Sequence, residues 1–489
     1  MMNIEKLLEN VKVCQSHITQ NSDISSVCID SRKVNDGAMF IAIKGIDNDG
    51  HSYIGKAIEN GAAAIVYQDS SYDEIITSKG VTAIRVENSR LAAAIIADNF
   101  YDHPSSKIHL VGVTGTNGKT TIATLLYQLF TSLGYGCGLL STIANYIEKD
   151  VFPTINTTSD PISINSLLAS MADRGCEYCF MEVSSHALDQ ERVAGLKFRG
   201  AIFTNLTHDH LDYHHTFAEY LKCKKRLFDN LPKDAFALVN IDDKNGKVMV
   251  QNTSAQIYTY SLRDAADFKV KIMEKSIEGS LLNIDGQDVW TRFIGTHNAH
   301  NLIAVYGAAI LLNAKKEEVL TQISALQSVS GRLEYIKGPR DITAVVDYAH
   351  TPDALENVLK TLKDIAAGNS LVCVFGCGGD RDATKRPEMG EIAEKYSDRI
   401  VITSDNPRSE EPEAIIRDIK GGLTTAGRAK SLFITDRREG IRTALMTANE
   451  GSIVLVAGKG HEDYQIIKGV KSHFDDKEVI REFFNEQEQ

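Results

Sequence analysis

A glycine-rich segment at residues 111–121, Val-Gly-Val-Thr-Gly-Thr-Asn-Gly-Lys-Thr-Thr, has the residue types that bind phosphate. An apolar run precedes it and apolar residues recur at helical spacing after it, which indicates a strand, a loop and a helix. In such a loop, backbone N–H groups face a phosphate, Lys119 reaches the β- and γ-phosphates, and the Thr120 hydroxyl holds Mg²⁺. Val113 replaces the first glycine of the usual GxxxxGK[ST] pattern, and Gly115 supplies the flexibility. The segment predicts binding of a nucleoside triphosphate.

Candidate metal ligands lie further along the same unit. Glu182 ends an apolar run, and a carboxylate at a strand end beside a phosphate loop is well placed to hold Mg²⁺. Residues 208–215 contain four histidines and two aspartates, which would suit a zinc hydrolase. Their spacing fits no standard zinc motif, so contact of one histidine with a hard metal or phosphate is favoured. Lys224 lies in a basic run typical of a solvated helix face, and a role as metal ligand would require carbamylation by CO₂.

Two asparagines stand at the start of a predicted helix that includes the apolar run 302–312. Asn298 and Asn301 are three residues apart and therefore share a face of the first turn. Their amides would suit recognition of a base edge, and simple helix capping is the alternative interpretation.

Four strand-like runs in the last third of the chain each end in a polar cluster. The clusters are Asp347-Tyr-Ala-His350, Gly376-Cys-Gly-Gly-Asp-Arg381, Asp405-Asn-Pro-Arg408 and Gly458-Lys-Gly-His-Glu462. In open parallel sheets, ligands bind outside the carboxyl ends of the strands. Four clusters in one domain therefore predict a second ligand site, distinct from the glycine-rich loop.

The composition is that of an ordinary globular protein, with 43% hydrophobic and 24% charged residues. Its net charge of -12 argues against a nucleic-acid-binding surface. No apolar stretch approaches the roughly 18 residues of a membrane span and the N-terminus lacks signal-peptide features, so we expect a cytoplasmic protein without a membrane partner. Eight cysteines do not indicate a disulfide framework. Cys176 and Cys179 are expected to be buried thiols rather than a redox or zinc pair.

The order of the apolar runs predicts an α/β fold with three domains in 489 residues. The first, at residues 1–102, alternates short strands and helices and lacks a phosphate loop. A turn-prone segment then leads into the central domain, at residues 103–329. The third domain, at residues 330–489, carries the four strand-end clusters.

Together these segments resemble the Mur ligase family along essentially the whole chain. The matching stretches, in family order, are Thr114-Gly-Thr-Asn-Gly-Lys-Thr-Thr121, Asn156-Thr-Thr158, Glu182-Val-Ser-Ser-His-Ala-Leu188, Asp209-His-Leu-Asp-Tyr-His214, Asp347-Tyr-Ala-His-Thr-Pro-Asp-Ala-Leu355, Phe375-Gly-Cys-Gly-Gly-Asp-Arg-Asp382, Asp405-Asn-Pro-Arg408 and Ala457-Gly-Lys-Gly-His-Glu-Asp-Tyr464. Several are long, which makes chance agreement negligible.

The resemblance implies a UDP-binding N-terminal domain, a central ATPase domain with a mostly parallel sheet, and a Rossmann-like C-terminal domain. It implies that ATP phosphorylates the D-glutamyl side-chain carboxylate of UDP-N-acetylmuramoyl-L-Ala-D-Glu, and that an amine then displaces phosphate from the acyl phosphate. The protein's part is charge neutralisation and alignment. A monomer acting in bacterial peptidoglycan precursor synthesis is expected.

The resemblance also implies residue roles at the matching positions. ATP contacts fall on Gly115, Thr116, Asn117, Gly118, Lys119, Thr120, Thr121, Asn298, Asn301, Arg332 and Asp347. Contacts to the UDP-muramoyl-dipeptide fall on Ser31, Asn156, Thr157, Thr158, Ser184, Gln190 and Arg192. One Mg²⁺ falls to Thr120 and Glu182, and a second to His210 and a carbamylated Lys224.

The amino acid that is added can be argued from charge. meso-Diaminopimelate carries a zwitterion at its far end, whereas lysine has only an ammonium there. In the third domain, Arg408 suits the carboxylate and Glu462 suits the ammonium. The Asp-Asn-Pro-Arg form resembles the diaminopimelate-adding branch, because lysine-adding relatives usually lack that arginine. The predicted pocket comprises Arg381, Asp405, Asn406, Arg408, Gly458 and Glu462.

Other interpretations remain open at this stage. The same ligase could add L-lysine, or the chain could be a folylpolyglutamate-type ligase, although the last two strand-end clusters speak against the latter. A regulatory ATP-binding module and the zinc hydrolase are alternatives from other classes. The chain also departs from the family pattern at His208, where arginine or glutamine is common, at His215, where glycine is usual, and at Ser330, where proline is frequent.

Overall fold

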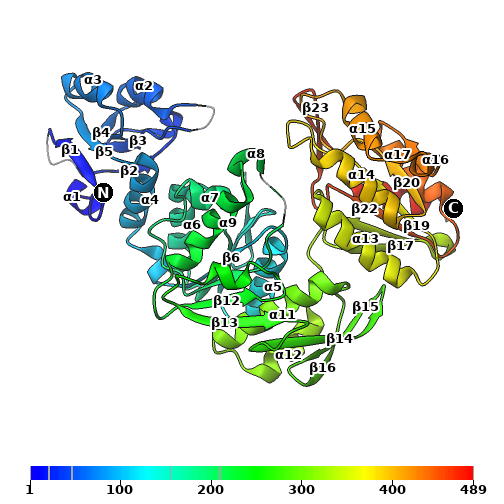
Figure 1. Cartoon of the computed structure of the whole chain (residues 1–489). Coiled ribbons are helices and arrows are strands. Elements are labelled where there is room, and N and C mark those ends of the chain that lie inside the picture. The colour runs from blue at the N-terminus through cyan, green and yellow to red at the C-terminus, as the bar shows by residue number, and fades with distance from the viewer. Residues whose placement is uncertain are drawn as a thin grey trace.

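The computed structural model describes residues 2–19, 23–45, 48–154, 156–207, 209 and 211–487. These residues form three large sheets covered by helices, which follow one another along the chain. In Figure 1 the N-terminal unit and the C-terminal unit stand on either side of the central one. The predicted α/β class and three-part architecture are confirmed.

The N-terminal unit is a small α/β layer. Its strands lie in the order β1 (Val13–His17), β5 (Thr82–Val86), β4 (Ala62–Tyr67), β3 (Ala38–Ile41) and β2 (Ser26–Cys28), with β1 antiparallel to a parallel set. Its helices are α1 (Ile4–Leu7), α2 (Ile54–Glu59), α3 (Asp73–Ser78) and α4 (Ser89–Phe100), with short 3₁₀ turns η1 (Ser31–Lys33), η2 (Gly50–Tyr53) and η3 (Ser70–Tyr72). Helix α4 begins where the Asn88 side chain accepts hydrogen bonds from two backbone N–H groups of the first turn.

The central sheet has a parallel core with antiparallel extensions at both edges. Its order is β16 (Gln287–Thr291), β15 (Gly279–Ile284), β14 (Phe268–Ser276), β13 (Gln256–Ser261), β12 (Phe236–Asn240), β11 (Gly200–Phe203), β6 (His109–Thr114), β10 (Tyr178–Glu182), β7 (Cys137–Leu140), β8 (Asn145–Ile147) and β9 (Asp150–Phe152). The parallel pairings run from β7 to β14. The core strands β10 and β11 are buried along their whole length, which explains why they are continuous apolar runs rather than alternating ones.

Helices cover both faces of the central sheet. They are α5 (Lys119–Ser132), α6 (Pro161–Asp173), α7 (Ser185–Asp189), α8 (Leu211–His214), α9 (Phe217–Asp229), α10 (Gly246–Met249), α11 (Thr296–Leu311) and α12 (Lys316–Ala325), with the turn η4 (Pro104–Ser106) before the first strand. One apolar core joins the sheet to α5 and α11, and a second joins the opposite face to α6 and α9. Strand β6 lies between β10 and β11 at the middle of the sheet, so the loop that follows it opens at the centre of the domain.

The C-terminal unit is a second doubly covered sheet. Its order is β17 (Glu334–Lys337), β18 (Thr343–Asp347), β22 (Ile453–Ala457), β19 (Leu371–Phe375), β20 (Arg399–Ile402) and β21 (Ser431–Phe433), parallel except at β17. Its other elements are η5 (Pro339–Asp341), α13 (Pro352–Ala366), α14 (Lys385–Tyr396), α15 (Pro412–Gly421), α16 (Thr425–Ala429), α17 (Arg437–Thr447), the hairpin β23 (Tyr464–Ile467) and β24 (Val470–His473), and α18 (Asp476–Gln487). The carboxyl ends of β18, β22, β19 and β20 therefore meet at one edge.

All eight cysteines lie in the described part of the chain and are free. Cys14 is exposed, and the other seven are buried. Burial raises the pKa of the Cys176 and Cys179 thiols. The expectation that these two are buried thiols is confirmed.

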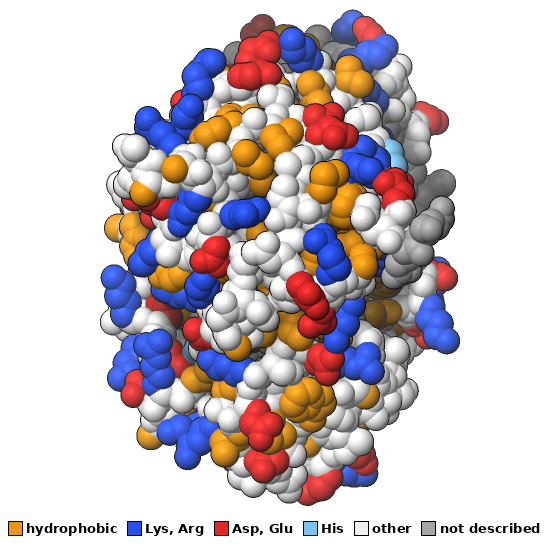
Figure 2. Space-filling model, turned by 90° about the vertical axis from the view of Figure 1, so that its right-hand side faces the viewer, with side chains coloured by type: hydrophobic (Ala, Val, Ile, Leu, Met, Phe, Trp, Pro, Cys, Tyr) orange, Lys and Arg blue, Asp and Glu red, His pale blue; other side chains and the backbone are white. Residues whose placement is uncertain are grey.

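The surface carries both signs of charge. Figure 2 shows Lys and Arg side chains interspersed with Asp and Glu, and only scattered apolar groups between them on this face. Within the described ranges, no helix is long and apolar enough to cross a membrane.

Candidate active site

The glycine-rich loop joins β6 to α5, and the helix begins at Lys119. Gly115 has φ +149° and Gly118 has φ +90°, in the region that favours glycine. A Cβ at Gly115 would lie 1.9 Å from Thr204 Oγ1, and one at Gly118 would lie 2.6 Å from Asn301 Oδ1. The two glycines let neighbouring elements close around the loop, so Gly115 replaces the missing first glycine of the pattern, as predicted.

Lys119 and Thr120 occupy the first turn of α5 and face inward. Lys119 Nζ donates to the carbonyl oxygens of Gly115 at 2.9 Å and Thr116 at 2.8 Å. Burial lowers the pKa of Lys119. Thr120 Oγ1 donates to Glu182 Oε2 at 2.9 Å. The structure thus brings Thr120 and Glu182, which are 62 positions apart in the sequence, into direct contact.

A residue that sequence reasoning missed, Thr142, fixes the Glu182 carboxylate. Its backbone N–H donates to Glu182 Oε1 at 2.7 Å and its hydroxyl approaches Oε2 at 3.2 Å. The same hydroxyl lies 3.2 Å from Thr157 Oγ1. Thr142 follows β7 directly, so the strand-end rule that singled out Glu182 would also have found it.

Lys224 lies on α9 and is 1% exposed. Its Nζ donates to the Gly115 carbonyl at 2.9 Å and lies 4.8 Å from the centre of the Tyr220 ring. Burial, together with the nearby Lys119 charge, holds the pKa of Lys224 well below its usual value. The basic run is therefore not a solvated helix face at this position. His210, the predicted partner of Lys224 at a metal, lies outside the described residues.

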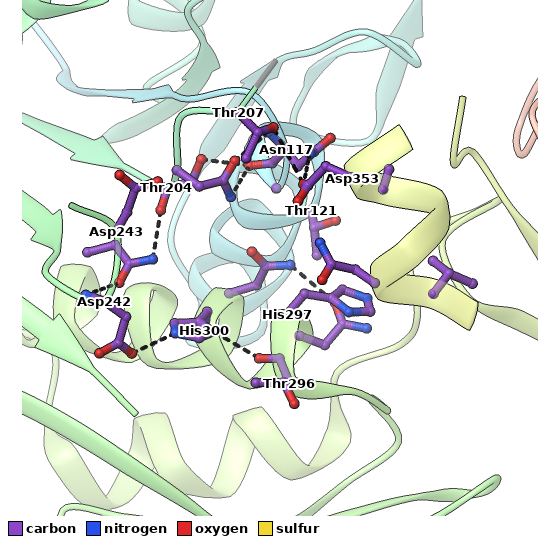
Figure 3. A pocket seen from close by; sticks show the side chains of 18 of the residues that line it. Asn117, Thr121, Thr204, Thr207, Asp242, Asp243, Thr296, His297, His300 and Asp353 are labelled. Carbon is purple, nitrogen blue, oxygen red and sulfur yellow. Dashed lines mark hydrogen bonds and ion pairs between the residues drawn. The ribbon is translucent and has the colours of Figure 1, made fainter. Parts of the chain in front are cut away.

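A cavity of about 280 Å³ opens beside the loop, between the central and C-terminal units. Figure 3 shows Asn117 and Thr121 at its top, His297 and His300 below, and Asp353 at the end of helix α13 on its right. Its walls are Asn117, Gly118, Thr121, Thr204, Asn205, Thr207, Asn240, Asp242, Asp243, Tyr260, Arg263, Thr296, His297, Asn298, His300, Asn301, Arg332, Asp347, Asp353, Ala354, Asn357 and Val358. It lies where a nucleotide held by the loop would extend.

Asn298 and Asn301 line this cavity and also bond locally. Asn298 Nδ2 donates to the Ile294 carbonyl at 3.0 Å, and Asn301 Nδ2 lies 3.2 Å from Asn298 Oδ1. The helix begins at Thr296, ahead of the apolar run that marked it in the sequence. Gly295 is the N-cap residue and no side chain caps the helix, so the capping interpretation is wrong. The position of both amides on the cavity wall suits recognition of a base.

The C-terminal unit reaches the glycine-rich loop directly. Arg332 Nη2 lies 3.4 Å from Thr120 Oγ1, and its guanidinium stacks 4.7 Å from the centre of the Tyr348 ring. Asn117 Nδ2 donates to Asp353 Oδ2 at 3.0 Å. Asp347 is buried and accepts two backbone N–H bonds, each 2.8 Å long. The two units thus share the walls of this cavity.

A second cavity, of about 380 Å³, gathers all four strand-end clusters. Its walls are Thr157, His186, Asp209, Tyr348, His350, Thr351, Pro352, Gly376, Gly378, Arg381, Asp382, Lys385, Glu388, Asp405, Asn406, Arg408, Gly458 and Glu462. The first three residues come from the central unit and the rest from the C-terminal unit. A ligand in this cavity would face Thr157 and Asp209, on the side where the phosphate loop lies.

The polar groups of this second cavity are tied to one another. Asn406 Nδ2 donates to Glu462 Oε2 at 2.8 Å, and Lys459 Nζ lies 3.2 Å from the same oxygen. Arg408 Nη1 donates to the Gly379 carbonyl at 2.6 Å. Asp405 Oδ2 is buried without a hydrogen-bond partner among the described residues. A carboxylate oxygen left without a donor inside a cavity is suited to bind a cationic group.

An ion pair that no sequence pattern indicated anchors two of the four loops. Arg437 and Asp476 are both fully buried, with Nε and Nη2 of the guanidinium each 2.7 Å from a carboxylate oxygen. The guanidinium also donates to the carbonyls of Ser404 at 3.2 Å and Ala457 at 3.1 Å. These carbonyls come just before Asp405 and just before the last cluster, so the pair fixes the floor of the cavity.

We expect Asp476→Asn to lower the free energy of unfolding by about 3–5 kcal/mol, because it leaves the Arg437 charge buried without its partner. Urea unfolding followed by circular dichroism measures the change. The matched control is Glu482→Gln, which breaks the exposed Arg438–Glu482 pair between the same two helices and should cost less than about 1 kcal/mol. Equal effects of the two substitutions would contradict the structural role of the buried pair.

Comparison with known proteins follows the same division of the chain. The profile described as "Mur ligase family, catalytic domain" matches residues 23–101, "Mur ligase middle domain" matches 113–309, and "Mur ligase, glutamate ligase domain" matches 331–460. UDP-N-acetylmuramoyl-L-alanyl-D-glutamate--2,6-diaminopimelate ligase of Phocaeicola vulgatus is 53% identical over 484 residues, which cover 99% of each chain.

The chain belongs to the Mur ligase family.

Further relatives agree with this membership. The protein of the same name from Cytophaga hutchinsonii is 52% identical over 484 residues, again covering 99% of each chain. A solved structure titled "Structure of UDP-N-acetylmuramoyl-L-alanyl-D-glutamate--2, 6-diaminopimelate ligase" is 34% identical, covers 96% of both chains and superposes with a TM-score of 0.67. The similarity therefore extends over all three units of this Mur ligase.

Four of the residues predicted to contact the muramoyl-peptide, Thr158, Ser184, Gln190 and Arg192, form one bonded group next to Glu182 in this Mur ligase. Thr158 Oγ1 donates to the Glu182 carbonyl at 2.8 Å and accepts from Ser184 N at 3.1 Å. Arg192 donates to the Thr158 carbonyl and to Gln190 Oε1, each at 2.7 Å. The predicted Asn156 is exposed and Thr157 lines the second cavity.

Ser31 lies apart from that group, in the N-terminal unit. It is buried at the start of η1, and its carbonyl accepts a hydrogen bond from Asn60 at 2.9 Å. A cavity of about 790 Å³ lies between the N-terminal and central units, and Ser31 is not among its walls. They are Asn10, Lys12, Lys44, Gly45, Gln68, Glu87, Asn88, Arg90, Leu91, Ala92, Ile95, Asp189 and Glu191.

Two of the three departures from the Mur ligase pattern have a structural account. His215 has φ +61°, a conformation that glycine adopts without strain, so the chain keeps the loop shape with a residue less suited to it. Ser330 is exposed, and its hydroxyl accepts a hydrogen bond from Lys477 Nζ at 2.9 Å. His208 lies outside the described residues.

Proposed function

We propose that this Mur ligase joins meso-diaminopimelate to the D-glutamate of UDP-N-acetylmuramoyl-L-Ala-D-Glu, with conversion of ATP to ADP and phosphate, in peptidoglycan precursor synthesis. The names of its relatives at 52–53% identity support the reaction. The observation that carries the proposal is the second cavity, in which Arg408 and Glu462 occupy one chamber with Thr157 and Asp209 of the ATPase unit.

The reaction has two steps. A carboxylate oxygen of the D-glutamyl side chain attacks the γ-phosphorus of ATP, ADP leaves, and an acyl phosphate forms. The amine nitrogen of the second substrate then attacks the carbonyl carbon, loses a proton and expels phosphate. Phosphorylation replaces a poor leaving group, oxide, by a good one, so the protein's contribution is to neutralise charge and align the reactants.

Lys119 and Arg332 supply positive charge at the phosphates. Lys119 is half-buried at the helix N-terminus, where it and the loop N–H groups stabilise charge on the transferring group. Arg332 comes from the C-terminal unit and already lies 3.4 Å from Thr120 Oγ1. The C-terminal unit also holds the proposed amino-acid pocket. One unit therefore both binds the amine substrate and supplies the Arg332 charge at the phosphates.

The metal and carbamate assignments are part of the proposal. Thr120 and Glu182 offer a hydroxyl and a carboxylate within 2.9 Å of each other, the oxygen donors that Mg²⁺ prefers. His210 and a carbamylated Lys224 would hold a second ion, and a neutral, buried Lys224 amine is the form that reacts with CO₂. When bound, Mg²⁺ would neutralise phosphate charge.

The remaining assignments follow the same logic. The adenine would lie in the cavity with Asn298 and Asn301, and Asp347 would approach the ribose. Arg408, supported by Arg381 and Asn406, would bind the distal carboxylate of diaminopimelate. The distal ammonium would meet Glu462, Asp405 and the Gly458 carbonyl. Ser31 is proposed to contact uridine, and Asn156, Thr157, Thr158, Ser184, Gln190 and Arg192 to contact the muramoyl-peptide.

The proposed domain bounds are 1–102, 103–329 and 330–489. We further propose that the protein acts as a monomer in the bacterial cytoplasm, where its nucleotide substrates are found.

The test is phosphate release from Mg-ATP with UDP-N-acetylmuramoyl-L-Ala-D-Glu and either meso-diaminopimelate or L-lysine. Turnover that requires diaminopimelate supports the proposal. Turnover with lysine alone would keep the ligase and refute the amino-acid assignment. Turnover that needs neither amino acid, or none with either, would refute the ligase and favour a regulatory ATP-binding module.

Arg408→Ala is expected to raise the KM for diaminopimelate by about 100-fold and the KM for ATP by less than about threefold, because only the carboxylate contact is lost. Steady-state kinetics with each substrate varied in turn measures both constants. Arg438→Ala is the control, since that arginine is exposed on α17. An unchanged KM for diaminopimelate would refute the pocket assignment.

A further inference from the structure

We propose that Lys459 determines the choice of amino acid, by balancing the charge of the distal end of the diaminopimelate pocket so that it fits a zwitterion rather than a lone ammonium. The inference rests on the proposed function and extends it to a residue that does not itself line the cavity. Its basis is the burial of Lys459, its bonds to two pocket residues and the number of charges around it.

Lys459 is fully buried, with 0% exposure. Its Nζ lies 3.2 Å from Glu462 Oε2 and 3.2 Å from Asn406 Oδ1, and 5.4 Å from the centre of the Tyr464 ring. A buried ammonium is costly unless it is paired and hydrogen-bonded, so these contacts define where the charge sits. Lys459 thus stands behind the two cavity residues that it touches.

Glu462 keeps one oxygen for a ligand. Oε2 accepts hydrogen bonds from both Asn406 Nδ2 and Lys459 Nζ. Among the described residues, no donor is bonded to Oε1. Close by, Asp405 Oδ2 also lacks a donor. A Cβ at Gly458 would lie only 2.6 Å from this oxygen, so the glycine leaves room beside the carboxylate. Two acceptor oxygens therefore border the same part of the cavity.

The buried and half-buried charges at this end cancel. The carboxylates are Asp382, Asp405, Glu462 and Asp476, and the cations are Lys385, Arg408, Arg437 and Lys459. Arg437 and Asp476 neutralise each other in a closed pair. What remains around the ligand is three carboxylates against Lys385, Arg408 and Lys459, and the exposed Arg381 and Glu388 of the same wall also cancel.

A neutral set of charges suits a ligand whose own charges sum to zero. The distal carboxylate and ammonium of meso-diaminopimelate leave the balance intact, whereas the single ammonium of lysine adds one uncompensated positive charge. In a buried site such an excess is strongly unfavourable because little water screens it. Without Lys459, the set would carry one negative charge in excess, and the lysine ammonium would restore neutrality.

The experiment compares Lys459→Met with the wild type, measuring kcat/KM for meso-diaminopimelate and for L-lysine by phosphate release and by mass spectrometry of the product. We expect the ratio of the two values to fall by about 100-fold, the effect of removing one unit charge about 5 Å away at an effective dielectric constant of about 20. Lys459→Arg, which keeps the charge, should retain most of the preference for diaminopimelate.

The matched control is Lys471→Met. Lys471 lies 3.9 Å from the centre of the same Tyr464 ring, but it is exposed and has no bond to Glu462. Its removal should leave the ratio unchanged. If Lys459→Met does not unfold cooperatively, Lys459→Gln provides the same test, because its amide keeps hydrogen-bonding capacity while removing the charge.

The outcomes separate this inference from the proposed function. A Lys459→Met or Lys459→Gln enzyme that turns over diaminopimelate with an unchanged ratio would overturn the role of Lys459 and leave the ligase assignment intact. A wild-type enzyme that releases no phosphate with diaminopimelate would instead overturn the proposed function, whatever the variants do.

Discussion

Lys119→Ala is expected to reduce kcat by about 10³-fold, the size of effect seen when a preorganised charge is removed from a transferring group. Lys119 is the half-buried cation of the loop, and its ammonium donates to the Gly115 and Thr116 carbonyls at 2.9 and 2.8 Å. A phosphate would give this ammonium a far stronger partner than two neutral oxygens. The variant loses that interaction but should keep the conformation of the loop, because that conformation depends on Gly115 and Gly118.

Phosphate release under saturating substrates measures the loss, and thermal unfolding checks that the variant folds. Lys107→Ala is a suitable control, because Lys107 lies near the start of the same domain and forms an exposed ion pair with Asp102. A kcat for Lys119→Ala within tenfold of the wild type would mean that another cation neutralises the phosphate. Arg332 would then be the first candidate.

Lys224→Ala is expected to reduce kcat by a similar factor of about 10³, because the proposed carbamate of Lys224 would be lost with the side chain. The chemistry depends on the state of the amine, since only a neutral amine adds to CO₂. Burial and the Lys119 charge lower the pKa of Lys224 well below its usual value, which favours the neutral amine. The two lysines thus have different roles although both bond the Gly115 carbonyl.

Rescue distinguishes a carbamate from a plain lysine. Added formate or acetate should restore part of the activity of Lys224→Ala, because a small carboxylate can occupy the vacated space. The same salts should not restore Lys224→Arg, which fills that space. Labelled bicarbonate should produce a carbamate signal in the wild type and none in either variant. Full activity of the wild type after removal of CO₂ and bicarbonate would contradict the assignment.

The strands and the loops that follow them were predictable because burial on both faces leaves a plain signal. The runs that became β10 and β11 are apolar throughout, and the polar residues after the C-terminal strands stand out against them. Since parallel strands end at a common edge, the sequence order of four clusters was enough to predict their convergence in space. Glu182 followed from its place at a strand end, and Thr120 followed from the pattern of the glycine-rich loop.

The supporting residues carried no comparable signal. Arg437 reaches Ser404, Ala457 and Asp476, partners that are 20 to 39 positions away, and nothing in a local window distinguishes it from a surface arginine. Lys459 was visible within a cluster, but its complete burial was not. Hydrophobic periodicity indicates which face of a helix or strand is buried. The burial of Arg437 and Lys459 instead depends on contacts between different elements, which a local sequence pattern does not contain.

Asn298 shows a different limit. Its spacing from Asn301 gave the shared face correctly, yet capping and base recognition require the same residue types. The structure places both amides on the wall of the first cavity, where Asn301 donates to Asn298 and Asn298 donates to the Ile294 carbonyl.

The distribution of cysteines makes this enzyme convenient for following domain movement. Cys14 on β1 is exposed, whereas the other seven thiols are buried. A maleimide dye should therefore label the N-terminal unit selectively in the native protein, with no cysteine having to be removed. Fluorescence of that single label would report when the N-terminal unit changes its surroundings, as each substrate is added in turn.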